Sequence, residues 1–429
     1  MKVALLSDCY LPRLGGIEVQ THDLAGQLVA LGHEVEVFTA TPGPEGQMHG
    51  AVTVVDGIPV HRLAIRLPWE LPVNPRAAKE LRRRLVSGGF DVAHVQTGVV
   101  SPFAWDCTRV TVGLGLPTAM TWHCMLGPVT SLFRAARFVR RWADRGVAMS
   151  AVSEVAAEPL RRVVGAAGDV TVLPNGIDVA RWRPSTPSDT GLSTGTGLST
   201  GSTVERPPTD EGPRTDERPP TDERPRTDEG PRTVERPLTD ERPLRLVTAM
   251  RLAPRKRPTA LVDLVRRAAD AAGPGSLDLT ILGEGPERRK IEAQLRRHGL
   301  DWVHLPGRVP RGELAARYAA SDVYLSPTRL ESFGIAALEA RTAGLPVVGR
   351  AGSGIGEFVI DGVGGRIVGD DAEMARVIAE LAADRDAVDR MRRWNLDHPP
   401  TQDWPAVAAL AVAEYDRARA LARLGSARR

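Results

Sequence analysis

The sequence predicts an α/β protein with two doubly wound domains, and three observations support this prediction. Short apolar runs alternate with amphipathic stretches from the start of the chain, a pattern typical of parallel sheets covered by helices on both faces. The pattern stops in a polar stretch at residues 185–243 and then starts again. Outside that stretch 370 of the 429 residues remain, enough for two domains with sizeable cores.

The first domain, residues 1–184, opens with an apolar run, a loop containing glycines and a helical pattern of apolar residues. The strands expected in this domain are Val3–Leu6, Val35–Phe38, Val92–Val95, Thr118–Trp122, Val147–Ser150 and Val170–Leu173. Ligands of such sheets bind beyond the carboxyl ends of the strands, so chemistry is expected in the loops that follow them.

The second domain, residues 244–398, repeats the alternation, with a helix expected around Ala260–Ala271. Its expected strands are Leu244–Thr248, Leu277–Leu282, Val303–Leu305, Val323–Leu325, Pro346–Gly349 and Gly365–Val368. Residues 399–429 are predicted to form a last helix over Trp404–Leu424. Its apolar face is expected to contain Trp404, Val407, Leu410, Ala411, Tyr415, Ala418 and Leu421. The cleft between the two domains is the expected ligand site.

The stretch at residues 185–243 contains a six-residue repeat between Glu205 and Asp240, with units such as ERPPTD and EGPRTD. Proline in every unit excludes a helix interior, and the stretch has few aliphatic side chains to bury. We therefore interpret it as a disordered linker between the domains, and a binding role for the repeat is the alternative interpretation.

Composition and simple motifs exclude several classes of function. The net charge of +3 gives no nucleic-acid footprint, and three cysteines without a Cys-x-x-Cys pair support neither a disulfide framework nor a zinc site. From this cysteine usage we expect a reducing cytoplasm. Neither a signal peptide nor an apolar run of membrane-spanning length is present, so no membrane span is expected. No P-loop motif occurs, and the glycines at 352–356 lack the third glycine of a dinucleotide loop. Asp384 and Asp386 lie in an Arg-rich helical pattern, so no metal is expected there.

The informative residues are in the second domain. Arg251 and Lys256 follow its first strand, and a Ser-Phe-Gly turn within residues 331–335 enters a helix that carries Glu339. The free N–H groups at the start of a helix suit a diphosphate, and the two cations would add charge opposite it. If Glu331 and Glu339 shared that helix they would be about 12 Å apart, too far to act together on one glycosidic bond.

At these residues the chain resembles the retaining glycosyltransferases of family 4, whose fold is two facing Rossmann-like domains (the GT-B fold). The resemblance covers essentially the whole chain outside the linker. Its matching motifs are Glu331-(x7)-Glu339, the Arg251 and Lys256 pair, Gly283-Glu-Gly285-Pro286, Pro174-Asn-Gly-Ile-Asp178 and Gly15-Gly16-Ile-Glu18. One departure is Arg257 before Pro258, where the family commonly has glycine after the lysine.

The resemblance implies a role for each matching residue. Arg251 and Lys256 would bind the leaving diphosphate, Glu331 the donor sugar and Glu339 the ribose diol, while His123 would contact the donor hexose. The implied catalytic residues are His123, Glu331, Arg251 and Lys256. The implied donor-binding residues are Gly15, Gly16, Arg251, Lys256, Ser332, Phe333, Gly334, Ile335 and Glu339. The last helix would pack back on the first domain. No metal or other cofactor is expected.

The resulting expectation is a cytoplasmic hexosyltransferase that uses a UDP- or GDP-linked sugar. The opening Ser7–Gly16 resembles members with inositol-type acceptors, and lipid-linked or glycan acceptors stay open. A basic helix expected at Ser131–Arg145 is interpreted either as a peripheral contact with anionic lipid at the inner face of the plasma membrane or as a solvated face. The rival functions are a nucleotide-sugar 2-epimerase of the same architecture and a non-catalytic partner subunit. His94 is interpreted as sheet packing or a pocket wall.

Overall fold

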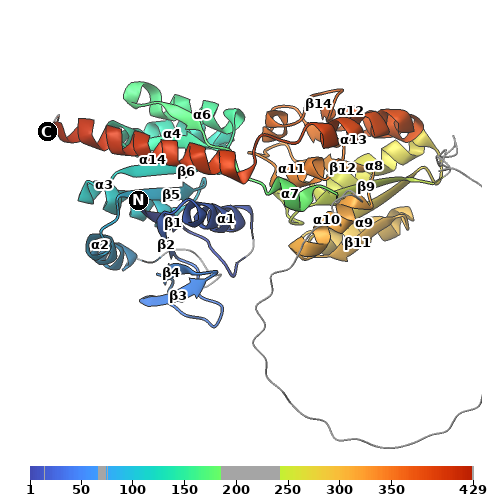
Figure 1. The fold of residues 1–429 in the computed structure, drawn as a ribbon. Coiled ribbons are helices and arrows are strands. Elements are labelled where there is room, and N and C mark those ends of the chain that lie inside the picture. The colour runs from blue at the N-terminus through green and yellow to red at the C-terminus, as the bar shows by residue number, and fades with distance from the viewer. Residues whose placement is uncertain (14, 66–73, 75, 185–241, 428–429) are drawn as a thin grey trace, which may run out of the picture. The chain divides into compact units, whose positions relative to one another are not determined.

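The computed structural model describes residues 1–13, 15–65, 74, 76–184 and 242–427. Residues 1–184 and 242–429 belong to one compact unit, built on two sheets flanked by helices (Figure 1). The repeat between Glu205 and Asp240, interpreted above as a disordered linker, lies outside the described residues. The α/β class and the two doubly wound sheets predicted from the sequence are confirmed.

The first sheet has eight strands in the order β3-β4-β2-β1-β5-β6-β7-β8. Its strands are β1 (Lys2–Ser7), β2 (Glu34–Thr39), β3 (Ala51–Val55), β4 (Ile58–Arg62), β5 (Val92–Thr97), β6 (Thr118–Trp122), β7 (Ala148–Ala151) and β8 (Val170–Val172). All neighbours pair in parallel except β3 and β4, so every strand of this sheet other than β3 places its carboxyl end along one edge. The six expected strands are therefore present.

The antiparallel pair β3 and β4 was not predicted. Asp56 and Gly57 connect the two strands, and both have positive φ, of 47° and 80°. An Asp-Gly pair between alternating apolar residues is a strong hairpin signal, because the turn that matches the strand twist requires positive φ at both positions. The sequence thus contained the signal, and the hairpin extends the sheet beyond β2.

Helices cover both faces of the first sheet, as the alternation of its side chains requires. Ala4 and Leu6 point into a core shared with α2, α3 and α6, whereas Val3 and Leu5 pack with α1 and α14. The helices of this half are α1 (Gly16–Ala30), α2 (Ala77–Gly88), α3 (Pro102–Leu114), α4 (Thr130–Ala136), α5 (Phe138–Asp144), α6 (Glu154–Val164) and α7 (Val179–Trp182). The single basic helix expected at Ser131–Arg145 is wrong: Arg137 has φ of 57° and separates α4 from α5.

The second sheet has six strands in the order β11-β10-β9-β12-β13-β14, all parallel. They are β9 (Leu244–Ala249), β10 (Leu277–Leu282), β11 (Val303–Gly307), β12 (Val323–Ser326), β13 (Val347–Arg350) and β14 (Gly365–Val368). The helices of this half are α8 (Pro258–Ala272), α9 (Arg288–His298), α10 (Arg311–Ala319), α11 (Ile335–Thr342), α12 (Asp371–Ala383) and α13 (Arg385–Asp397). All six strands predicted for this domain are present.

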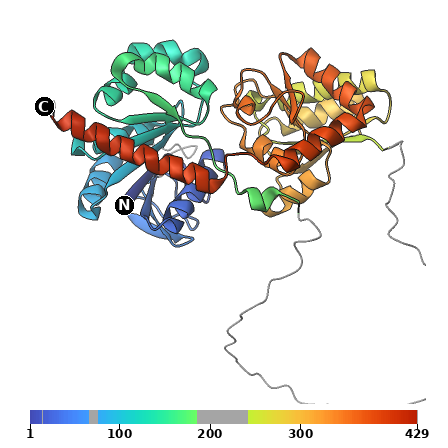
Figure 2. The same ribbon diagram turned by 45° about the horizontal axis from the view of Figure 1, so that its top comes forward.

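The last helix, α14 (Trp404–Ala427), packs on the first sheet although it follows the second sheet in the chain (Figures 1 and 2). Trp404, Val407, Ala411, Tyr415 and Ala418 are buried in the core beneath β1, β5 and β6. Leu410, predicted on the same face, is instead 46% exposed, because its position in the helical turn points away from the sheet. Conversely, Trp182 of α7 packs with α11 of the second half.

Candidate active site

The turn at Glu331–Gly334 ends in α11, the helix on which the sequence placed the diphosphate. Gly334 is the N-cap residue of α11, and its carbonyl accepts hydrogen bonds from the N–H groups of Ala337 and Leu338. Within the described part of the chain, the N–H groups of Phe333, Gly334 and Ile335 have no recorded hydrogen-bond acceptor. The turn therefore offers unpaired donors at the positive end of a helix dipole, as an anion requires.

Glu331 lies before α11, not on it, so the helical spacing used to place it about 12 Å from Glu339 does not apply. Its carboxylate forms an ion pair with Lys256, with 2.5 Å between Oε2 and Nζ. Both side chains are largely buried, at 15% and 25% exposure. The structure thus brings together two of the predicted residues, and this lysine is within reach of the turn that precedes α11.

Arg251 lies on the segment after β9, and its position follows from the glycines that come after β10. A Cβ at Gly283 would lie 1.9 Å from the Met250 carbonyl oxygen, so only glycine lets the two segments run side by side. Backbone hydrogen bonds join the segments on both sides of Arg251, from Met250 N–H to Leu282 and from Leu252 N–H to Glu284. Leu252 is fully buried, whereas Arg251 is exposed and has no recorded partner among the described side chains. Within the described part of the chain, Arg251 is therefore a cation without a structural partner.

Arg257, at the departure from the family pattern, adopts the left-handed conformation with φ of 59°. This is the conformation that glycine adopts most easily, which explains the family preference at this position. The Arg257 guanidinium forms two hydrogen bonds with Asp371, at 2.9 and 2.6 Å, and one with the Pro327 carbonyl. Its charge is therefore engaged elsewhere, and Lys256 alone pairs with Glu331.

Gly15 and Gly16 begin α1 of the first half. Gly15 is the N-cap residue in an extended conformation, and a Cβ on Gly16 would lie 3.3 Å from Cδ1 of Ile335. This close approach places the N-termini of α1 and α11 next to each other. Where the positive ends of two helix dipoles meet, the binding of one anion by both helices is favoured.

His123 follows β6 and connects the two halves. Its backbone carbonyl accepts a hydrogen bond of 2.6 Å from the Ser332 hydroxyl, and the Ser332 carbonyl accepts one from Ser153. The imidazole Nε2 lies 2.5 Å from Oε1 of Gln96. Burial lowers the pKa of His123 to about 4, and a hydrogen bond with Asn175 opposes this only in part. The ring is therefore neutral at pH 7 and lies beside the turn before α11.

Glu339 is buried within α11, with a relative exposure of 6%. The pKa of its carboxyl is raised to about 7, mainly by burial. The Arg311 guanidinium opposes this shift, and the Asp23 carboxylate adds to it. Arg311 Nε is 3.8 Å from Glu339 Oε1, and Arg311 Nη1 donates a 2.9 Å hydrogen bond to Asp23 of α1. Glu339 thus belongs to a charged cluster of its own, without a recorded contact with Lys256 or Glu331.

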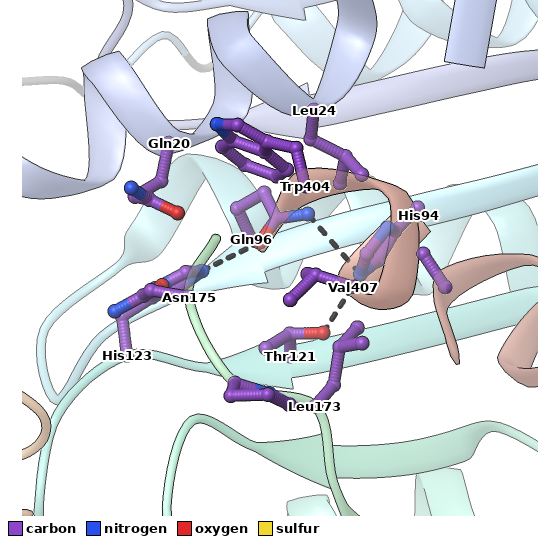
Figure 3. Close-up of a pocket in the computed structure, with 12 residues that line it drawn as sticks. Gln20, Leu24, His94, Gln96, Thr121, His123, Leu173, Asn175, Trp404 and Val407 are labelled. Atoms are coloured by element: carbon purple, nitrogen blue, oxygen red, sulfur yellow. Dashed lines mark hydrogen bonds between the residues drawn. The ribbon is translucent and has the colours of Figure 1, made fainter. Parts of the chain in front are cut away.

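A small cavity of about 20 Å³ lies against His123 in the first half (Figure 3). Among the side chains that line it, His94, Gln96 and Thr121 point toward one another from β5 and β6. The pocket-wall interpretation of His94 is therefore correct.

Sequence reasoning gave no role to Gln96, Asp23 or Arg311. A signal for Gln96 was available just beyond the predicted strand Val92–Val95, since residues 94 and 96 are both polar and alternate residues of a strand share one face. No local pattern connects Asp23 with Arg311, because these residues are 288 positions apart.

Among the described residues, no cluster of three or more His, Cys, Asp or Glu side chains could hold a metal ion. Asp384, discounted above as a metal ligand, accepts a hydrogen bond from Ala387 N–H at the start of α13. None of the helices in the described ranges is both long and apolar enough to cross a membrane.

Two family models match the chain in sequence order. The model described as Glycosyltransferase Family 4 matches residues 14–181, and the one described as Glycosyl transferases group 1 matches residues 232–395. The protein belongs to glycosyltransferase family 4. It is a hexosyltransferase that uses a nucleotide sugar.

Curated relatives agree with this family. A GDP-mannose-dependent alpha-(1-6)-phosphatidylinositol monomannoside mannosyltransferase of Mycobacterium tuberculosis is 26% identical over 402 residues, 90% of each chain. A D-inositol 3-phosphate glycosyltransferase of Arthrobacter sp. is 24% identical over 435 residues, 94% of this chain and 90% of that protein. These names give no support to the epimerase alternative.

Solved structures show the same fold at low identity. The glycosyltransferase superposes on a sucrose-phosphate synthase from Thermosynechococcus elongatus with a TM-score of 0.69 at 20% identity, covering 98% and 99% of the two chains. Anabaena HepE in complex with UDP and glucose gives a TM-score of 0.66 at 16% identity, covering 96% and 98%. The predicted GT-B architecture is thereby confirmed.

Proposed function

We propose that this glycosyltransferase moves a hexose, with retention of configuration, from a GDP- or UDP-linked sugar to a hydroxyl of an inositol-bearing acceptor. The main observation is the turn before α11, where unpaired N–H groups lie near Lys256. The relatives named for GDP-mannose, phosphatidylinositol mannoside and inositol phosphate support the choice of substrates.

The diphosphate leaving group would occupy the start of α11. Its charge would be stabilised by the N–H groups of residues 333–335, by Lys256 and by the unpartnered Arg251. Lys256 would exchange its contact with Glu331 for one with a phosphate oxygen. Because two protein cations supply charge at the leaving group, we propose transfer without a metal ion or other cofactor.

The carboxylate freed from Lys256 would then be available to the hydroxyl groups of the hexose. The His123 backbone carbonyl binds the Ser332 hydroxyl, and the neutral His123 ring would accept a hydrogen bond from the same sugar or donate one to it. Glu339 would bind the ribose diol through its carboxylate. Gly15 and Gly16 would allow the loop before α1 to approach the phosphates.

The acceptor side includes a basic surface formed by α4 and α5. Its exposed residues are Arg134, Arg137, Arg140, Arg141, Arg145 and the 67% exposed Leu132. No ion pair within the described residues engages these arginines. Near an anionic membrane leaflet, each such arginine contributes about 1 kcal/mol to the free energy of membrane binding. We propose that this surface holds the enzyme at the inner face of the plasma membrane, where a phosphatidylinositol acceptor is located.

A panel of sugar nucleotides tests the proposal. GDP-, UDP- and ADP-sugars are compared by thermal shift, because a ligand bound only to the folded state raises Tm by mass action. The stabilising donor is then incubated with inositol 1-phosphate, inositol 3-phosphate or phosphatidylinositol vesicles in the presence of EDTA. We expect a glycosylated inositol whose anomeric configuration matches that of the donor. Hydrolysis alone, an inverted product or a metal requirement would contradict the corresponding part of the proposal.

A further inference from the structure

A buried chain of hydrogen bonds leads from His123 through the first sheet to the last helix, and Figure 3 shows its part between His123 and His94. Gln96 Oε1 lies 2.5 Å from His123 Nε2, and Gln96 Nε2 lies 3.1 Å from His94 Nε2. His94 Nδ1 is then 3.0 Å from the hydroxyl of Tyr415 on α14. Gln96, His94 and Tyr415 are all buried.

The cavity of about 20 Å³ lies directly beside this chain. Its volume suffices for about one water molecule, and polar side chains from β5, β6 and α1 line it. Close packing is therefore absent on one side of the His123 and His94 rings. Hydrogen bonds, rather than packing alone, fix the orientation of both imidazoles.

The carboxamide of Gln96 determines which ring nitrogens carry protons. Its oxygen only accepts, so the nitrogen that faces it, Nε2 of His123, carries a hydrogen. Its amino group only donates, so Nε2 of His94 presents a lone pair. The hydroxyl of Thr121, 2.7 Å from the same His94 nitrogen, supplies a second donor. His94 consequently carries its proton on Nδ1 and donates to Tyr415.

We propose that Gln96 is a positioning residue that holds His123 as the Nε2–H tautomer, and that His94 and Tyr415 support Gln96 from behind. The inference rests on the proposed function, in which His123 contacts the donor hexose. With Nε2–H engaged by Gln96, Nδ1 carries the lone pair of the ring and would accept a hydrogen bond from a sugar hydroxyl. The last helix thereby contributes to the reaction site as well as to the core.

At neutral pH, neither histidine ring carries a charge that would change the hydrogen bonds of this network. Burial lowers the pKa of His123 to about 4. Burial also lowers the pKa of His94 to about 3, and the neighbouring His123 lowers it further. The titratable neighbours of the His123 ring are His94 on β5 and Cys124, the next residue in the chain. Tyr415 on α14 lies beyond His94. The nearest charged pair is Glu331, on the adjoining turn, with Lys256. Both rings are neutral at pH 7, so the network sets the tautomer.

The test compares four single variants, one of which is His123→Ala, and one double variant of the full chain. Gln96→Leu removes both hydrogen bonds at similar volume, and Gln96→Glu keeps an acceptor for His123. Thr118→Val is the matched control, because this buried hydroxyl on β6 bonds only to the Leu116 carbonyl. The double variant combines Gln96→Leu with His123→Ala. Each is measured for kcat, donor KM, pH profile and Tm.

We expect Gln96→Leu to lower kcat about 100-fold, as misorientation of a reacting group does, with donor KM changed less than threefold. Gln96→Glu should recover most of this loss and move the acidic limb of the pH profile upward, since a carboxylate raises the pKa of a neighbouring histidine. In the double variant, loss of Gln96 should cost less than twofold beyond loss of His123. Thr118→Val should leave kcat unchanged.

Unchanged kcat in a folded Gln96→Leu variant, or additive losses in the double variant, would overturn the proposal. If Gln96→Leu does not fold, ¹⁵N NMR of the wild-type histidines decides, because it reports the tautomer without substrate. A proton on Nδ1 of His123 would refute the assignment. The proposed function fails separately, if the wild-type enzyme transfers no hexose from any GDP- or UDP-sugar while the Nε2–H tautomer is observed.

Discussion

The carboxyl ends of the two sheets are built differently. At the end of β5 and β6 the polar side chains are buried, neutral and bonded to one another, with Gln96 between two imidazoles. Beyond β9 and β12 lie the charged Lys256, Glu331 and Arg251, and Arg251 is exposed without a partner among the described residues. A neutral buried network fixes geometry, whereas exposed unpaired charge is free to meet a charged ligand. Under the proposed function, the first half would orient the sugar-binding groups and the second half would stabilise the charge of the diphosphate.

The largest effect is expected from truncation before Trp404, which removes α14 from the first sheet. Trp404, Val407 and Tyr415 are buried there, and loss of a large buried side chain typically costs about 2–5 kcal/mol. The sum is comparable to the whole stability of a typical domain, about 5–15 kcal/mol. We expect loss of cooperative melting for the first half. A truncated chain with wild-type Tm would show that α14 is dispensable for the fold.

We call the region beyond the carboxyl ends of β9 and β12 the charged end, and removal of its cations should lower catalysis and leave the fold intact. Replacement of Lys256 or Arg251 by alanine is expected to lower kcat by about 10²–10³, the usual cost of removing one group that stabilises developing charge. Arg255→Ala is the matched control, since this exposed arginine has no recorded contact in the described structure. Equal rates for Lys256→Ala and Arg255→Ala would remove the distinction between the two ends.

The charge of the Glu339 carboxyl is expected to change near neutral pH, and donor binding should change with it. Burial raises its pKa to about 7, so the free enzyme carries a neutral carboxyl below that pH and a carboxylate above it. If the carboxylate accepts hydrogen bonds from the ribose diol, donor KM should rise as the pH falls below about 7, with little change in kcat. Glu339→Gln should raise donor KM about tenfold, as loss of a charged hydrogen bond does, and should abolish this pH dependence.

A pH-independent donor KM in the wild-type enzyme would contradict the ribose assignment. So would a Glu339→Gln variant that loses kcat while its KM is unchanged.

The smallest effect is expected from excision of Glu205–Asp240, residues outside the described structure. Loop closure costs only about 0.6 kcal/mol per doubling of length, so shortening the segment should change kcat and Tm little. Loss of activity in a shortened chain that still folds would show that the repeat is a functional element.

The two parts of the charged end, residues 251–256 and 331–335, were predictable because each is contiguous in the sequence. Residues 331–335 form one turn, and Arg251 and Lys256 follow a single strand. The buried network was not predictable, since His94 and Tyr415 are 321 residues apart and no local pattern connects them. Long-range packing also decided that Glu331 pairs with Lys256 and that Glu339 lies with Arg311. The β3 and β4 hairpin was missed for a different reason, because its Asp56-Gly57 signal was present and not used.

A structure of the enzyme with GDP or UDP bound would show directly where the diphosphate lies. We expect a β-phosphate within hydrogen-bond distance of the N–H groups of residues 333–335. Lys256 Nζ should have moved from Glu331 to a phosphate oxygen, and Arg251 should lie on the other side of the diphosphate. A diphosphate bound elsewhere, with the 2.5 Å contact between Lys256 and Glu331 retained, would contradict this expectation.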